Sequence, residues 1–166
     1  PNLYRYGNTT GGHPKDEELR AAVELLITTG DKQYAKRIAA LWSAIDERFM
    51  WNAVPAVRAL PHMDKAFAAK LRKRAARFLN ESKGMLTENP FGVPITRGGW
   101  AGNGAVIGFG LTNYYLHKAF PDLFTKDATI RALDYLYGTH PDSNISFVSA
   151  VGAHSKRVAY GNNRAD

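Results

Sequence analysis

The residues best suited to holding a polar ligand gather in the last stretch of the chain, SAVGAHSKRVAYGNNRAD. His154, Asn162, Asn163 and Arg164 bring an imidazole, two carboxamides and a guanidinium close together in sequence. Such groups form directed hydrogen bonds, and the planar guanidinium forms two in parallel. Sugar rings are bound by side chains of this kind together with aromatic rings that stack on C–H faces. The stretch is therefore a candidate binding loop, with a locally hydrogen-bonded loop histidine as the alternative for His154.

A second group of candidates lies in the glycine-rich stretch RGGWAGNG. Trp100 offers a ring for stacking and Asn103 a carboxamide, and both precede an apolar helical pattern. The alternative is that Trp100 fills the core while the glycines allow close helix packing. For Trp51, Tyr4 and Tyr6 we favour packing or solvated loop positions over ligand binding.

Carboxylates are the groups that hydrolyse glycosidic bonds, and they work as an acid and a base about 6.5–9.5 Å apart in inverting enzymes. Asp16, Glu17 and Glu18 open a predicted helix, where acids favour the helix dipole. Glu88 lies in a predicted loop, and a solvated position is expected for it. Asp166 follows the Asn-Asn-Arg stretch. We predict no catalytic carboxylate within this chain.

Several other chemistries find no support in the residues. Cysteine is absent, which excludes thiolate catalysis and cysteine-bound metals. The five histidines lack the spacing of metal ligands, although a Ca²⁺ site near Asp142 and Asn144 stays open. The stretch GNGAVIGFG lacks the strand and lysine of a phosphate-binding loop. We therefore expect no metal and no cofactor.

The charge balance raises nucleic acid as a partner, because the formal net charge is +7. The most basic run is KLRKRAAR, with its cations at Lys70, Arg72, Lys73, Arg74 and Arg77. These positions wrap around a helix instead of forming one stripe. We predict a solvated outer helix face and no nucleic-acid partner.

Apolar spacings of three and four predict an all-α protein of about six helices. Gly30 and Gly138 are expected to end helices, and Asp31 and Asp64 to begin them. Pro55 should kink or break the segment ERFMWNAVPAVRAL. Leu19, Val23, Leu26 and Ile27 are expected on one buried face, and AVIGFGLTNYYLHKAF reads as a helix buried on most sides. Short strands or turns are expected around ISFVSAVG, and no apolar run approaches the ~20 residues of a membrane span.

Three stretches together resemble glycoside hydrolase family 9, the family of cellulases and endoglucanases. DEELRAAVELLITTGDKQY is similar to the family's helical hairpin DE..WAAAELY.ATGD..Y, and NPFGVPITRGGWAGNGAV to its loop NP.G.P....WG.N..V. YLYGTHPDSNISFVSAVGAHSKRVAYGNNRAD resembles Y.LG.NP...SYV.G.G...P...HHR. The stretches occur in the family's order and at about its spacing, and they span nearly the whole chain.

The resemblance implies that residues 1–166 are the middle to C-terminal part of an (α/α)6-barrel catalytic domain, with about half of the barrel's helices. It places the family's catalytic Asp before this chain and its catalytic Glu after it. Half a barrel would expose its inner helices, so the remainder is expected as another fragment or chain. The family also implies a secreted or periplasmic location, and the start at Pro1 suggests processing or cutting.

The implied activity is inverting hydrolysis of β-1,4-glucosidic or related β-linkages in an oligo- or polysaccharide. The resemblance gives Arg164, His154, Trp100 and Asn103 roles in the substrate cleft. Asn162 and Asn163 stand where the family has two histidines, which places ordinary cellulose in doubt as the substrate. Two alternatives follow: an exo-acting β-glucosidase or β-glucosaminidase on the same barrel, and a non-enzymatic basic helical binding module.

Overall fold

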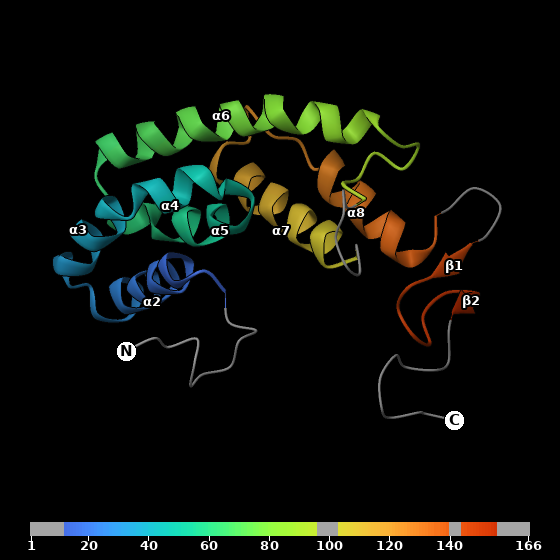
Figure 1. Ribbon diagram of the computed structural model, residues 1–166, viewed down its shortest axis with the longest axis horizontal. Coiled ribbons are helices and arrows are strands. Elements are labelled where there is room, and N and C mark those ends of the chain that lie inside the picture. The colour runs from blue at the N-terminus through green and yellow to red at the C-terminus, as the bar shows by residue number, and fades with distance from the viewer. Residues whose placement is uncertain (1–11, 96–102, 140–143, 156–166) are drawn as a thin grey trace. The chain divides into compact units, whose positions relative to one another are not determined.

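A computed structural model describes residues 12–95, 103–139 and 144–155 (Figure 1). Most of these residues are helical, which confirms the all-α class. The helices are α2 (Pro14–Thr29), α3 (Lys32–Ala40), α4 (Trp42–Glu47), α5 (Phe49–Ala59), the 3-10 turn η1 (Leu60–His62), α6 (Lys65–Thr87), α7 (Asn103–Ala119) and α8 (Asp127–Tyr137). Two strands of two residues each, β1 (Ile145–Ser146) and β2 (His154–Ser155), pair in parallel. No helix in the described ranges is both long and apolar enough to cross a bilayer.

The chain divides into two compact units, Pro1–Ala75 and Ala76–Asp166. The first unit packs α2 against α3 and α5 around a core of aliphatic and aromatic side chains. That core includes Leu19, Val23, Leu26, Ile38, Ile45, Phe49, Phe67 and Leu71. The burial of Leu19, Val23 and Leu26 confirms the predicted inner face of α2, although Ile27 is exposed.

The predicted helix ends of the first unit are confirmed. Gly30 ends α2 with a φ of 69°, a left-handed conformation that suits glycine. Asp31 begins α3 by accepting a hydrogen bond from the Gln33 N–H at 2.9 Å. Asp64 accepts one from the Phe67 N–H at 2.7 Å at the start of α6. Helical hairpins thus form where the sequence places its caps.

The structure bears on two expectations about helix continuity. The predicted second helix is split at Leu41, whose N–H bonds to the carbonyls of both Arg37 and Ile38 and tightens the chain into a turn. This split gives seven α-helices in the described residues instead of about six. Pro55 does not break the helix, because α5 runs through it from Phe49 to Ala59, and a kink at Pro55 stays a prediction.

Two side chains of the first unit also differ from expectation. Trp51, which was expected in the core, is 46% exposed. Arg74, which was expected to point outward, is 8% exposed and forms an ion pair with Asp46 at 2.7 Å. The Arg74 guanidinium also lies over the Phe49 ring, 4.4 Å from its centroid. One cation of the basic run therefore belongs to the interior.

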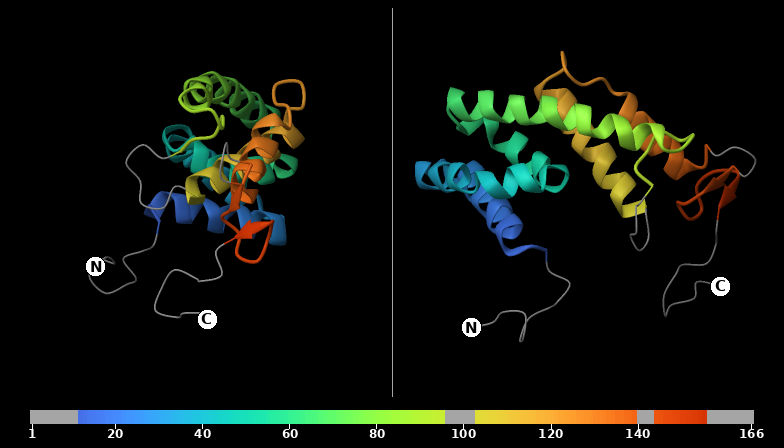
Figure 2. Two further views of the ribbon diagram at one scale, coloured as in Figure 1. Left: turned by 90° about the vertical axis from the view of Figure 1, so that its right-hand side faces the viewer. Right: turned by 45° about the horizontal axis from the view of Figure 1, so that its top comes forward.

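The second unit is built on the hairpin of α7 and α8, which lie side by side in both views of Figure 2. Gly110 allows their close approach, since a Cβ atom there would lie 2.8 Å from the Cβ of Ala132. The Thr129 hydroxyl donates to the Gly110 carbonyl at 3.1 Å across the same contact. The core of this unit includes Val93, Val106, Phe109, Leu116, Phe120, Phe124 and Ala132.

Substituting Gly110 with alanine should lower the free energy of unfolding by about 1–3 kcal/mol, because the added methyl group overpacks the α7–α8 contact. Gly104→Ala is the matched control on the same helix, since a Cβ atom there meets nothing within 4 Å. That control should be neutral or stabilising by up to about 1 kcal/mol. Urea unfolding of both variants measures the difference. Equal stability of the two would contradict the close contact.

Helix α7 is less buried than its composition predicts. Ile107, Leu111 and Tyr114 are exposed and follow the i, i+4, i+7 spacing of one helix face. On α8, Ile130, Leu133 and Tyr137 are exposed at the spacing i, i+3, i+7. The hairpin therefore carries apolar stripes that no described residue covers.

Candidate functional site

The structure describes two of the six predicted binding residues. Asn103 is the first residue of α7, and His154 is the first residue of β2. Trp100, Asn162, Asn163 and Arg164 lie outside the described residues, as does Asp142 of the open calcium question. His154 lines one of the two clefts of the second unit that are described below, and Asn103 lines neither.

His154 belongs to residues 144–155, here called the terminal strap. The strap is attached to the end of α8 through Gly138, whose φ of 93° is left-handed. A Cβ atom at Gly138 would lie 2.6 Å from the carbonyl carbon of Ile145, so glycine is needed at this crossing. The Phe147 N–H then donates to the Leu136 carbonyl at 2.9 Å. The turn and short strands expected around ISFVSAVG are confirmed.

The strap encloses an open hollow of about 720 Å³ that His154 lines with Ser149, Ala150, Gly152 and Ser155. His154 is exposed. Its backbone is fixed by pairing with Ile145. Ala150 has a φ of 62°, a conformation that costs energy for a residue with a side chain. The imidazole is thus exposed to solvent on a backbone that strand pairing holds, and its binding role stays a prediction.

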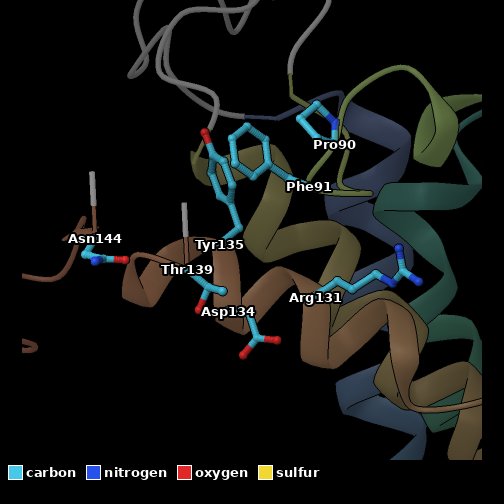
Figure 3. Close-up of a pocket in the computed structure, with 7 residues that line it drawn as sticks. All are labelled: Pro90, Phe91, Arg131, Asp134, Tyr135, Thr139 and Asn144. Atoms are coloured by element: carbon cyan, nitrogen blue, oxygen red, sulfur yellow. The ribbon is translucent and has the colours of Figure 1, made fainter. Parts of the chain in front are cut away.

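A second cleft lies between the strap, α8 and the loop before α7 (Figure 3). Its volume is about 430 Å³, within the range of small-ligand sites. The lining consists of Pro90, Phe91, Arg131, Asp134, Tyr135, Thr139 and Asn144. None of these residues was predicted for the site, although Phe91 and Tyr135 lie within the quoted stretches NPFG and YLYG.

The loop at residues 88–95 forms one wall of this cleft and is braced by Asn89. The Asn89 carboxamide donates to the Val93 carbonyl at 2.7 Å and accepts from the Phe91 N–H at 3.0 Å. Gly92, with a φ of 62°, lies against Arg131, whose Nη1 would be 2.5 Å from a Cβ atom at Gly92. The loop is therefore shaped by its own hydrogen bonds and by a close contact with α8.

The cleft combines aromatic rings with hydrogen-bonding groups of each kind. Phe91 and Tyr135 contact each other edge to face, with ring centroids 5.4 Å apart. Asp134, Thr139 and Asn144 supply a carboxylate, a hydroxyl and a carboxamide. This composition suits a ligand with apolar faces and a hydroxyl rim. The cleft supplies one carboxylate, Asp134, whereas general acid–base hydrolysis uses two.

Asp16 is the most buried carboxylate of the described residues, with 2% exposure. Burial raises the pKa of Asp16. Hydrogen bonds from Asn52 and Arg48 and the charges of Arg48 and His13 lower it, and together they outweigh the effect of burial. The pKa therefore lies below the ordinary value of 3.8, which keeps the carboxylate charged. Its oxygens accept hydrogen bonds from Arg48 at 2.6 Å and from Asn52 at 2.8 Å. Asp16 is accordingly a structural group and no candidate for acid catalysis.

Among the described residues, no three histidine, aspartate or glutamate side chains converge as metal ligands. Comparison with known proteins adds no assignment: no protein-family model matches the chain, and no curated protein is significantly similar to it. The resemblance to family 9 therefore stays a prediction. The function has to be inferred from the residues and the clefts.

Proposed function

We propose that this chain is part of an inverting glycoside hydrolase of the family 9 type, which cleaves β-1,4-glucosidic or related β-linkages. In this proposal the chain is about half of an (α/α)6 barrel and forms walls of the substrate cleft. The catalytic base and acid come from the rest of the same barrel. A polymeric substrate also suits an enzyme outside the cytoplasm, either secreted or periplasmic.

One observation carries the proposal. The second and third of the family-like stretches, which are far apart in sequence, meet at one cleft of the second unit. Phe91 comes from the second stretch, while Tyr135 and Asn144 come from the third. Aromatic rings beside carboxamide, hydroxyl and guanidinium groups are what a pyranose needs. Residues of two stretches that are far apart in sequence thus line one cleft, together with Arg131 and Asp134 of α8, and this supports the proposal.

The exposed apolar stripes of α7 and α8 support the part of this proposal in which the remainder of the barrel packs against this chain. Ile107, Leu111 and Tyr114 form a face that water solvates poorly. Monomeric proteins seldom expose contiguous apolar surface of this kind without a partner. In a barrel, neighbouring inner helices would cover such a face.

Asn162 and Asn163 favour a second candidate on the same barrel, an exo-acting β-glucosidase or β-glucosaminidase. Asparagine donates and accepts hydrogen bonds but cannot carry the charge of a histidine. Rates on long glucans compared with rates on disaccharides, amino sugars included, would separate the two candidates. The rival basic binding module is weakened by Arg74, which is buried against Asp46.

The proposal is tested with the complete protein and soluble β-1,4-glucan. We expect hydrolysis that releases the inverted, α-configured anomer. Proton NMR during the first turnovers measures the configuration of the product. The isolated chain should be inactive in the same assay, because both catalytic carboxylates are proposed to lie outside it. Hydrolysis by the isolated chain, or retained configuration in the complete protein, would contradict the proposal.

A further inference from the structure

Tyr135 lies between two aromatic side chains from different segments. Its ring centroid is 5.4 Å from that of Phe91, with the planes at 67°. The centroid of Phe147 is also 5.4 Å away, with the planes at 45°. Phe91 belongs to loop 88–95 and Phe147 to the terminal strap, so one residue of α8 contacts both segments. Figure 3 shows the Phe91 and Tyr135 rings side by side at the cleft.

The two outer rings are held by their own backbones. The Phe91 N–H is bonded to the Asn89 side chain at 3.0 Å, and the Phe147 N–H to the Leu136 carbonyl at 2.9 Å. A ring on a held backbone loses little further freedom when it packs. Each ring contact therefore adds to the forces that hold the segment bearing the ring. The position of Tyr135 therefore affects loop 88–95 and the strap together.

Simple core packing does not account for this arrangement. Phe91 and Tyr135 pack at the edge of a buried cluster formed by Val93, Val106 and Ala132. Phe147, in contrast, is 47% exposed, and the strap that bears it is largely exposed. Core packing alone would not require Tyr135 to contact an exposed ring such as Phe147. A contact of this kind is what would connect the core to the exposed strap. The stack continues from the core to the strap.

We propose that Tyr135 is a positioning residue that couples loop 88–95 to the terminal strap and holds the two cleft walls in one arrangement. Its effect on catalysis rests on the proposed glycosidase function. Phe91, Tyr135 and Asn144 line one cleft, so the coupling would act on substrate binding through that cleft. The coupling itself is a property of this chain and is measurable without substrate.

Hydrogen–deuterium exchange of the chain tests the coupling. Tyr135→Leu should speed exchange of the strap amides, among them Phe147 and Val151, about tenfold, because the stack is lost. Tyr135→Phe keeps the ring and should exchange like the unsubstituted chain. Tyr137→Leu is the matched control, since it removes an exposed tyrosine from the same helix and should leave the strap unchanged. Unchanged strap exchange in Tyr135→Leu would overturn the proposal.

Phe147→Leu gives a second variant in case Tyr135→Leu does not fold. Phe147 is on the exposed strap, so its loss spares the core, and the same tenfold faster strap exchange is expected. Strap exchange equal to that of the unsubstituted chain would contradict the coupling from the other side of the stack.

Kinetics of the complete protein test the catalytic consequence. With β-1,4-gluco-oligosaccharides, Tyr135→Leu should raise KM about tenfold and change kcat less than twofold, and Tyr135→Phe should restore KM. A lowered kcat with unchanged KM would overturn the positioning role. If the unsubstituted protein hydrolyses no β-linked sugar, the proposed function fails, while the exchange experiment still decides the coupling.

Discussion

Asp16→Ala is expected to lower the free energy of unfolding by about 2–3 kcal/mol, the usual cost of leaving charged or buried hydrogen-bonding partners unsatisfied. The Asp16 carboxylate is buried and accepts from Arg48 at 2.6 Å and from Asn52 at 2.8 Å. Its removal leaves the buried Asn52 amide with one acceptor, the Ala44 carbonyl. Urea unfolding followed by tryptophan fluorescence measures the effect, because Trp42 and Trp51 lie in the same unit as Asp16.

Glu17→Ala is the matched control for Asp16. Glu17 occupies the same first turn of α2 but is exposed, and it pairs with Arg20 one turn away. Exposed pairs of this kind contribute at most about 1 kcal/mol. A loss of stability in Glu17→Ala as large as that in Asp16→Ala would show that acids at this end act through the helix dipole alone.

The contribution of Asp16 should depend on pH in a defined direction. Its pKa in the folded chain is lowered, so its stabilisation is fully present above the ordinary pKa of 3.8. The stabilisation is lost as the pH falls through the lowered folded-state value. Asp16→Asn should therefore be less stable than the unsubstituted chain at pH 7, and the difference should shrink as the pH falls below 3.8 and through the lowered folded-state pKa. A difference that persists unchanged at low pH would contradict the charged network.

The features that the sequence predicts well are those decided by neighbouring residues. Gly30 and Gly138 end helices because a left-handed residue is needed there, and Asp31 and Asp64 begin helices because a nearby N–H needs an acceptor. Both requirements are met within a few residues of the chain. The all-α class follows from the same local periodicity.

The features that sequence analysis missed depend on distant partners. Arg74 is buried because its guanidinium pairs with Asp46 and lies over the Phe49 ring. Neither partner belongs to the run KLRKRAAR. The split at Leu41 is the exception, because its N–H is shared between the nearby carbonyls of Arg37 and Ile38. Propensity and periodicity do not resolve such choices.

The candidate site shows the same division. Part of the cleft lies within the quoted stretches, although none of its lining residues was predicted for the site and Arg131 and Asp134 lie outside those stretches. The sequence did not indicate that Phe91, Tyr135 and Phe147 stack, because ring contacts depend on how the loop, α8 and the strap fold together. His154 was found from its residue type and sequence neighbours, and the structure presents it on an exposed strap.

Arg164→Ala in the complete enzyme is expected to lower kcat/KM about 10–100-fold, the equivalent of losing charge-assisted hydrogen bonds to the substrate. Arg164 lies outside the described residues, so this prediction rests on its place in the family-like stretch. A guanidinium binds two neighbouring hydroxyls in parallel, which a lysine ammonium cannot reproduce. Arg164→Lys should therefore recover little of the activity.

The control for Arg164 is Arg157→Ala, which removes the same charge a few residues earlier. It should leave kcat/KM within about twofold of the unsubstituted enzyme, because Arg157 is not among the predicted site residues. Unfolding midpoints of both variants should match the unsubstituted enzyme, since the role predicted for Arg164 is in substrate binding and not in folding. Equal losses in the two variants would indicate that the segment attracts substrate by charge alone. A loss confined to Arg164→Ala identifies directed hydrogen bonds, and a fall in kcat would place them in the transition state.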